Sequence, residues 1–128
     1  MATHKGSEGV VKAGGNTIAE VTGFSFDETA DTIESTALSN SARSFVSDLV
    51  QFSGTIDCFF DETDTAQNAM TAGSQLTIEL YPEGTGSGAT FFTGSVIITS
   101  IARANAIGAL VTASFGFQGT GGLTSTTV

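Results

Sequence analysis

The chain has 128 residues, the size of one ordinary domain, and no break in its composition divides it. Hydrophobic residues make up 40% of it, with ten phenylalanines supplying most of the bulk, which suffices for one core. Thirteen acidic residues against four basic ones give a formal charge of −9. Because this charge repels phosphates, ordinary binding to a nucleic-acid backbone is a poor hypothesis.

In the N-terminal half, alternation of apolar and polar residues predicts strands. Strands at 9–13 and 17–26 should flank a tight turn at Gly14-Gly15-Asn16, because these residues accept positive φ angles. Residues 27–50 scatter their apolar positions among Ser, Thr and acidic residues, which predicts a long loop. An extended hairpin that reaches a neighbouring subunit is the alternative for part of it. The next strand should bury Phe52, Ile56, Cys58 and Phe60 on one face.

The C-terminal half begins with the one segment that is typical of a helix. This helix is expected over about 62–72, with Asp61 as its N-cap. Alternating strands follow around Leu76–Leu80 and Val96–Ile98, separated by a glycine-rich loop that starts at Pro82. After a turn at 105–108, one face of the last strand should carry Ile107, Ala109, Val111, Ala113, Phe115 and Phe117. Residues 119–128 are expected to form a tail that is ordered only when a partner holds it.

These elements indicate an all-β protein with antiparallel sheets, open sheet edges and one short flanking α-helix. We treat residues 1–128 as a single domain with an N-terminal arm at 1–8. The start lacks the apolar stretch of a signal peptide, and no later stretch approaches membrane-spanning length, so the default location is the cytoplasm of the producing cell.

Residues for catalysis are few. His4 lies in the expected arm without a basic partner nearby, and the lone Cys58 fits a buried apolar position. The acidic run at 61–64 lacks the glycine and the distal glutamate of a calcium loop. We therefore assign no catalytic, cofactor-binding or metal-binding residue. Arg43 and Arg103 fit either weak surface ion pairs or charge pairs across a subunit interface.

The order of the segments resembles a known family. The residues that carry the resemblance are AEVTGFSFDETADTIE (19–34), VQFSGTIDCFFDETD before the helix, LYPEG (80–84) and the closing FGFQGTG (115–121). Together they are similar to the tail tube, or major tail, proteins of long-tailed bacteriophages and of related prophage and gene-transfer particles. The resemblance spans essentially the whole chain.

The resemblance implies a β-sandwich-like or barrel-like subunit that forms stacked homo-hexameric rings by continuing its sheets across the interfaces. DNA would pass through the hollow tube without specific binding, and tape-measure and terminator or baseplate proteins would be further partners. The location would be the virion tail, assembled in the host bacterial cytoplasm. The loop at 27–50, with Arg43, Phe45 and Leu49, and also Arg103 would make inter-subunit contacts. Glu20, Asp57 and Glu79 are candidates for an acidic lumen.

Three other hypotheses about function are also compatible with the sequence. A phage decoration or adhesin-like β-sandwich would bind a partner's surface as a monomer or trimer. A lipocalin-like carrier would use the phenylalanine-rich face as a ligand pocket. An enzyme is the least supported of these readings.

Overall fold

The structure is a computed structural model that describes residues 9–18, 21–39 and 41–128. These residues form one strongly bent antiparallel sheet and one short helix, which confirms the predicted all-β fold. The order across the sheet is β2-β1-β5-β6-β7-β4-β3. The elements are β1 (Val10–Ala13), β2 (Asn16–Thr17), β3 (Val21–Glu34), β4 (Phe45–Phe59), α1 (Thr65–Ala69), β5 (Gln75–Tyr81), β6 (Thr90–Ala104) and β7 (Thr112–Thr127).

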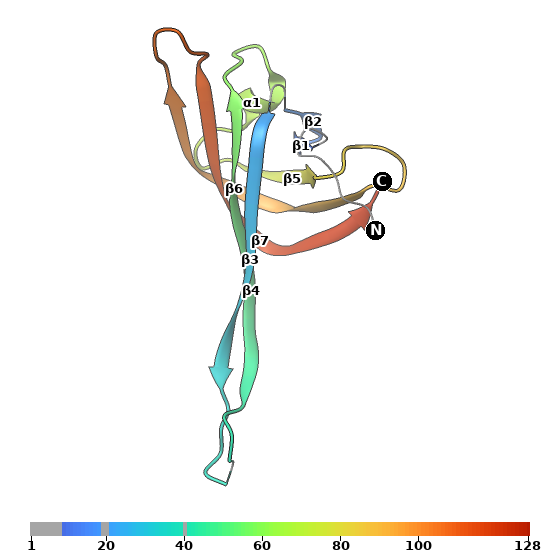
Figure 1. Cartoon of the computed structure of the whole chain (residues 1–128), viewed down its shortest axis with the longest axis vertical. Helices are drawn as coiled ribbons and strands as arrows, with labels where there is room; N and C mark the ends of the chain where they lie inside the picture. Colours follow the sequence, from blue (N-terminus) through green and yellow to red (C-terminus); the bar gives the residue numbers. More distant parts are fainter. Residues whose placement is uncertain (1–8, 19–20, 40) are drawn as a thin grey trace.

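The long strands β6 and β7 turn this single sheet into two layers. They pair along their whole length, but β5 joins the first half of β6 whereas β4 joins the first half of β7. Because β6 and β7 are antiparallel, those two halves lie at opposite ends of the ribbon. Register shifts between Thr93 and Ser95 and between Ile98 and Ser100 mark irregularities of the kind that bend a strand. The sheet therefore folds over itself (Figure 1).

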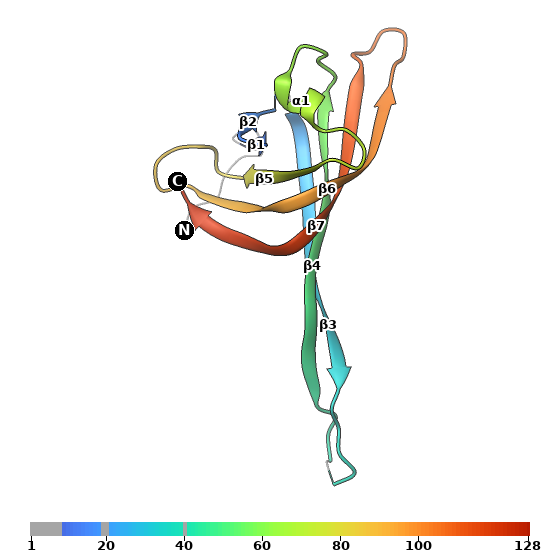
Figure 2. The ribbon, with the colours of Figure 1, turned by 180° about the vertical axis from the view of Figure 1, so that it is seen from behind.

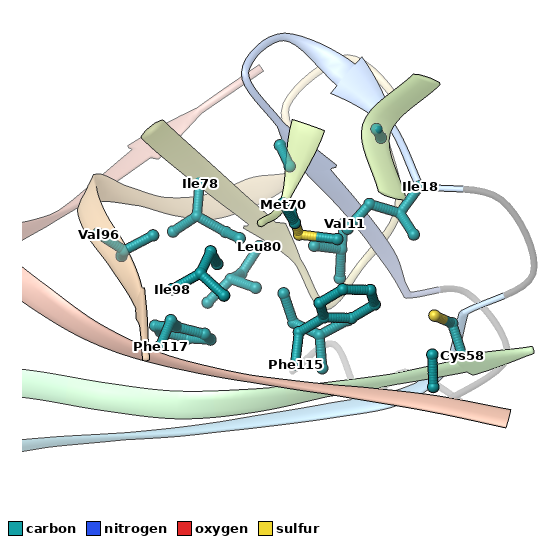
Figure 3. Close-up of a cluster of buried hydrophobic side chains, with 14 of the residues drawn as sticks. Val11, Ile18, Cys58, Met70, Ile78, Leu80, Val96, Ile98, Phe115 and Phe117 are labelled. Atoms are coloured by element: carbon teal, nitrogen blue, oxygen red, sulfur yellow. The ribbon is translucent and has the colours of Figure 1, made fainter. Parts of the chain in front are cut away.

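The core fills the space between the layers. Figure 3 shows Val11, Ile78 and Leu80 from β1 and β5 facing Phe115 and Phe117 from β7. All five side chains are buried, as the alternation in β5 and β7 predicts. The turn at Gly14-Gly15 is also confirmed, since Ala13 pairs with Asn16 and both glycines have positive φ angles.

Phe52 lies where β4 and β7 separate. Pairing between the two strands ends at Ser53 and Gln118, after which β7 continues into the other layer. The buried Phe52 ring occupies the angle between them and packs on Gly94 and Gly119, where a Cβ atom would overlap the ring. The Gln118 Nε2 donates to the Phe52 carbonyl oxygen at 3.1 Å, which satisfies a backbone group at this fork.

Residues 27–50 are mostly strand, so the expectation of a long loop is wrong, and the strand pairing of the hairpin alternative is confirmed. β3 and β4 pair as far as Glu34 and Phe45, and residues 35–44 connect them. The ribbon extends well beyond the two-layered body (Figures 1 and 2). A register shift near Asp48 and Leu49 interrupts the alternation, which is why the sequence pattern did not predict strands here.

Further expectations about the tail, the helix, the last strand and Phe60 are corrected. Residues 119–127 are not a tail but the second half of β7, because Thr120 and Thr124–Thr127 pair with β6. The helix covers only Thr65–Ala69, and its N-cap is Asp64, because Asp61 instead accepts hydrogen bonds from Thr63. Residues 107–111 precede the last strand, so Ile107 and Ala109 are exposed rather than on a buried strand face. Phe60 lies one residue beyond the end of β4 and is 37% exposed.

Candidate assembly surfaces

One face of the four-stranded part of the sheet, β6-β7-β4-β3, is lined mainly by small or polar residues, with Ile97 as the one large hydrophobic exception in its rows. The register places three rows across these strands: Gly23, Asp57, Ser114 and Ala102; Ser25, Thr55, Gly116 and Ser100; and Asp27, Ser53, Gln118 and Ile97. We call this set the polar face. The opposite face of the same strands carries core residues such as Ile56 and Phe115.

The polar face has a consistent chemistry. The twelve residues in its rows include two aspartates but no lysine, arginine or aromatic residue. Its hydroxyl groups also bond to one another, since Ser25 Oγ lies 3.3 Å from Thr55 Oγ1. These twelve residues offer neither the cations that hold phosphates nor the aromatic rings on which bases stack. One cation lies beside them, since Arg103 follows Ala102 in β6 and lines a hollow together with Asp57.

The predicted lumen residues do not share one surface. Asp57 lies exposed on the polar face, whereas Glu79 is on β5 in the other layer. The Glu79 carboxylate accepts a hydrogen bond of 2.6 Å from the Tyr81 hydroxyl. Burial, together with that carboxylate, raises the pKa of Tyr81 to about 12. Glu20 lies outside the described residues.

Asp27 is an acidic residue of the polar face that sequence reasoning missed. The register aligns it with Ser53, two rows from Asp57. The alternation of Phe24 and Phe26 with Ser25 and Asp27 contains the signal, but the scattered apolar pattern from residue 27 onwards predicts a loop that begins at Asp27. The exposed carboxylates of this face are therefore Asp27 and Asp57.

The projecting part of the β3–β4 hairpin exposes a large apolar surface. Phe45 and Leu49, two predicted contact residues, are 55% and 80% exposed. Ile33, Leu38, Val46 and Val50 are exposed there too. A two-stranded ribbon without a layer behind it gains little from these side chains in an isolated subunit. Arg43, by contrast, is 3.9 Å from the Glu34 carboxylate, an exposed pair of little energetic weight.

Arg103 lies at the opposite end of the molecule from the hairpin tip, near the end of β6. Its guanidinium carbon is 5.5 Å from the centroid of the Phe60 ring, a cation–π arrangement. Within the described part of the chain, Arg103 has no carboxylate in ion-pair contact. Ile107 and Leu110 in the following turn are strongly exposed.

Both outer strands of the four-stranded part have open edges. Among the described residues, β3 pairs with β4 alone. On the other side, β5 accompanies β6 to Ile97, and Ile98 exchanges hydrogen bonds with Gly73 and Ser74 at 2.7 and 2.9 Å. Beyond Ile98, no described strand covers this edge of β6. Open edges of this length present backbone groups that a second chain can pair with.

Among the described residues there is no group of three or more His, Cys, Asp or Glu arranged to hold a metal ion. Burial raises the pKa of the Cys58 thiol to about 11, with the charges of Asp64 and Asp57 adding to the effect, so the thiol is protonated at neutral pH. A hollow of about 320 Å³ beside Asp57 and Ser114 opens at the surface. No helix in the described residues is long and apolar enough to cross a membrane.

The sandwich with a projecting hairpin is the fold of tail proteins from phage-like particles. The chain is similar to a protein in the tail of an empty gene transfer agent particle with C6 symmetry, with a TM-score of 0.78 and 20% identity over 97% of this chain and 99% of that chain. A chain from the virion of a native gene transfer agent particle matches over the same shares with a TM-score of 0.78 and 19% identity. The SPP1 tail tube matches with a TM-score of 0.71 and 14% identity over 93% of this chain and 77% of that chain. No family model and no curated protein sequence matches the chain.

Proposed function

We propose that the chain is a tail tube subunit that forms homo-hexameric rings, and that the rings stack into a tube through which a genome is delivered. The observation that carries the proposal is the polar face bounded by two open edges. Its strands β6, β7, β4 and β3 are antiparallel at every junction, so the outer strands β3 and β6 run in opposite directions. When identical copies stand upright side by side, β3 of one copy meets β6 of the next in the antiparallel sense.

Such pairing supports a closed ring. Each subunit supplies one open edge of each kind, and rotation of identical copies joins them until no edge is left. The C6 symmetry of a similar tail favours six copies. The polar face then forms the inner wall, because the other face of these strands is occupied by the core.

The wall suits the passage of DNA without binding. Asp27 and Asp57 repeat around the ring, and no cation lies in the rows of the polar face. At physiological salt these carboxylates repel phosphates over a screening length of about 8 Å. The small hydroxyl side chains leave no aromatic platform on which bases could stack. DNA therefore passes through the channel without being bound by its wall.

The other partners and the location follow from this role. A tube of this kind requires a tape-measure protein inside it and terminator or baseplate proteins at its ends. The site of action is the virion tail, with assembly in the cytoplasm of the host bacterium. The projecting hairpin and the arm at 1–8 serve contacts between subunits, and the role is structural rather than enzymatic.

Thiol labelling of assembled protein tests the inner wall. Ser114→Cys places a thiol on the polar face, and Glu79→Cys places the matched thiol on the other layer. In unassembled subunits both should react with a small maleimide and with a bulky polyethylene-glycol maleimide. In tubes seen by electron microscopy, only the Ser114→Cys thiol should lose its reaction with the bulky reagent. Equal protection of both thiols, or protection of Glu79→Cys alone, would contradict the assigned wall.

A further inference from the structure

A hollow of about 340 Å³, which we call the edge hollow, opens beside the free edge of β3. Three of its lining residues, Thr22, Gly23 and Phe24, belong to the start of that strand. The other two come from the other layer, since Gly9 precedes β1 and Pro82 follows β5. The register shift next to Gly23 leaves Thr22 without a partner in β4. The edge hollow therefore borders backbone groups that a further strand can pair with.

The open end of β6 carries two side chains in the same rows as the edge hollow. Through β7 and β4, the register aligns Ile101 with Phe24 and Arg103 with Val21. The residues between them in both rows are buried, so these side chains lie on the core side of the sheet. Rotation about a ring axis leaves the height of a residue unchanged. In a ring of upright copies, Ile101 and Arg103 of one copy therefore lie beside the edge hollow of the next.

The edge hollow and the open end of β6 lie on opposite sides of the molecule. Figures 1 and 2 show the end of β5, with the loop that follows it, on one side and the turn between β6 and β7 on the other. Complementary features on opposite sides of one chain make a heterologous contact, which closes into a ring when the rotation allows it. The two features thus belong to the junction between neighbours in a ring.

The two sides of this junction also complement each other in charge. Within the described part of the chain, Arg103 has no carboxylate in ion-pair contact, and its guanidinium carbon lies 5.5 Å from the centroid of the Phe60 ring. On the other side, Glu83 directly follows Pro82, and its carboxylate accepts a hydrogen bond of 3.1 Å from the Thr90 N–H. That bond holds the carboxylate in place, and a carboxylate can accept several hydrogen bonds, including a bidentate pair from arginine.

We propose that the edge hollow receives Ile101 and Arg103 of the neighbouring copy in the ring. Ile101 covers Phe24, which is only half-buried in the single subunit, and the Arg103 guanidinium binds the Glu83 carboxylate. The inference rests on the proposed tube, and it adds a side-chain contact to the backbone pairing of β3 with β6.

This contact determines the register of the junction. An antiparallel pair that slips by two residues keeps every side chain on its own face, so backbone pairing alone leaves more than one register open. A charge pair across the junction favours the register in which the opposite charges meet. The stack on Phe60 orients the Arg103 guanidinium beforehand, which lowers the entropy that the contact costs. Arg103 is therefore a positioning residue of the ring.

Zero-length crosslinking tests the contact. Arg103→Lys keeps the positive charge and supplies an amine, which a carbodiimide joins to a carboxylate only where the two are in direct contact. The assembled protein is treated with the carbodiimide and separated on a denaturing gel. We expect a ladder of covalent multimers that ends at the hexamer, in line with the C6 symmetry of a similar tail. Mass spectrometry of the bands should find position 103 joined to position 83. Wild-type protein and the double variant Glu83→Gln/Arg103→Lys are the matched controls, and neither should give this ladder.

The outcomes separate the two proposals. If electron microscopy shows rings and tubes of Arg103→Lys but the gel shows no more multimers than for the wild type, the contact is wrong and the tube proposal stands. A ladder of equal strength from Glu83→Gln/Arg103→Lys also overturns the contact. If the wild-type protein assembles under no condition, both proposals are overturned.

A charge swap tests the positioning role of Arg103. Arg103→Glu should raise the protein concentration needed for rings several-fold, because two carboxylates then meet at every junction. Adding Glu83→Lys to the same chain should restore most of the loss, which a purely structural role of Arg103 would not allow. Mass photometry measures that concentration. Ring formation by Arg103→Glu at the wild-type concentration, or no rescue by the second change, contradicts the pairing.

Discussion

Replacing Gly119 with alanine tests the packing of Phe52 at the fork where β4 and β7 separate. A Cβ atom at Gly119 would overlap the Phe52 ring, and the ring cannot retreat because Gly94 bounds it on another side, where an added Cβ would lie 2.7 Å from Cζ. Overpacking of this kind costs about 2 kcal/mol. With an unfolding entropy of about 2.1 cal/mol/K per residue, that corresponds to a drop in Tm of about 7 °C for this chain length.

The assay is thermal unfolding of the unassembled subunit, followed by circular dichroism at low protein concentration. Gly122→Ala is the matched control, since its added Cβ would meet no atom within 4 Å. The control should unfold at the wild-type temperature or slightly above, because alanine restricts the unfolded chain more than glycine does. Phe52→Leu should relieve the overlap, so the double variant should lose at least about 1 kcal/mol less than the sum of the two single variants. If Gly119→Ala unfolds within 1–2 °C of the Gly122→Ala control, on the order of the usual surface effect, the account of the fork is wrong.

Two further predictions concern the helix cap and the buried thiol. Asp64→Ala should destabilise the subunit by about 1 kcal/mol, because the Asp64 carboxylate accepts a hydrogen bond from the Ala66 N–H. Denaturant unfolding measures this loss of stability, and an unchanged unfolding midpoint would show that the cap is dispensable. Because the pKa of Cys58 is raised from 9.0 to about 11, the unfolded chain releases the thiol proton first, and stability should fall as the pH rises from 9 towards 11. Cys58→Ala should lessen this alkaline loss, and equal pH profiles for both proteins would contradict the assignment.

Local sequence patterns predicted the elements whose alternation is uninterrupted. Ile78 and Leu80 in β5 and Phe115 and Phe117 in β7 alternate strictly, and all four are buried as expected. The turn at Gly14-Gly15 was equally clear, since its residues suit positive φ angles. In these segments the local pattern, strand alternation or a turn of two glycines, is enough to determine the conformation.

The predictions were wrong where distant partners decide the conformation. Residues 119–128 contain glycine, threonine and serine with little hydrophobic signal, yet pairing with β6 makes them strand. For residues 27–50 the hairpin was only the alternative prediction, because the apolar residues there face no core and a register shift interrupts the alternation. The alternation in its strand correctly predicted that Asp57 lies on a polar strand face. Only the pairing register of the sheet shows that Asp57 shares that face with Asp27, whereas Glu79 lies in the other layer.

The most direct measurement of the central claim is electron microscopy of the purified protein over a range of concentrations. The account predicts rings of uniform diameter with six-fold symmetry in class averages, and stacks of such rings at higher concentration. Particles that remain single subunits at every concentration, or closed assemblies without a central channel, would contradict it.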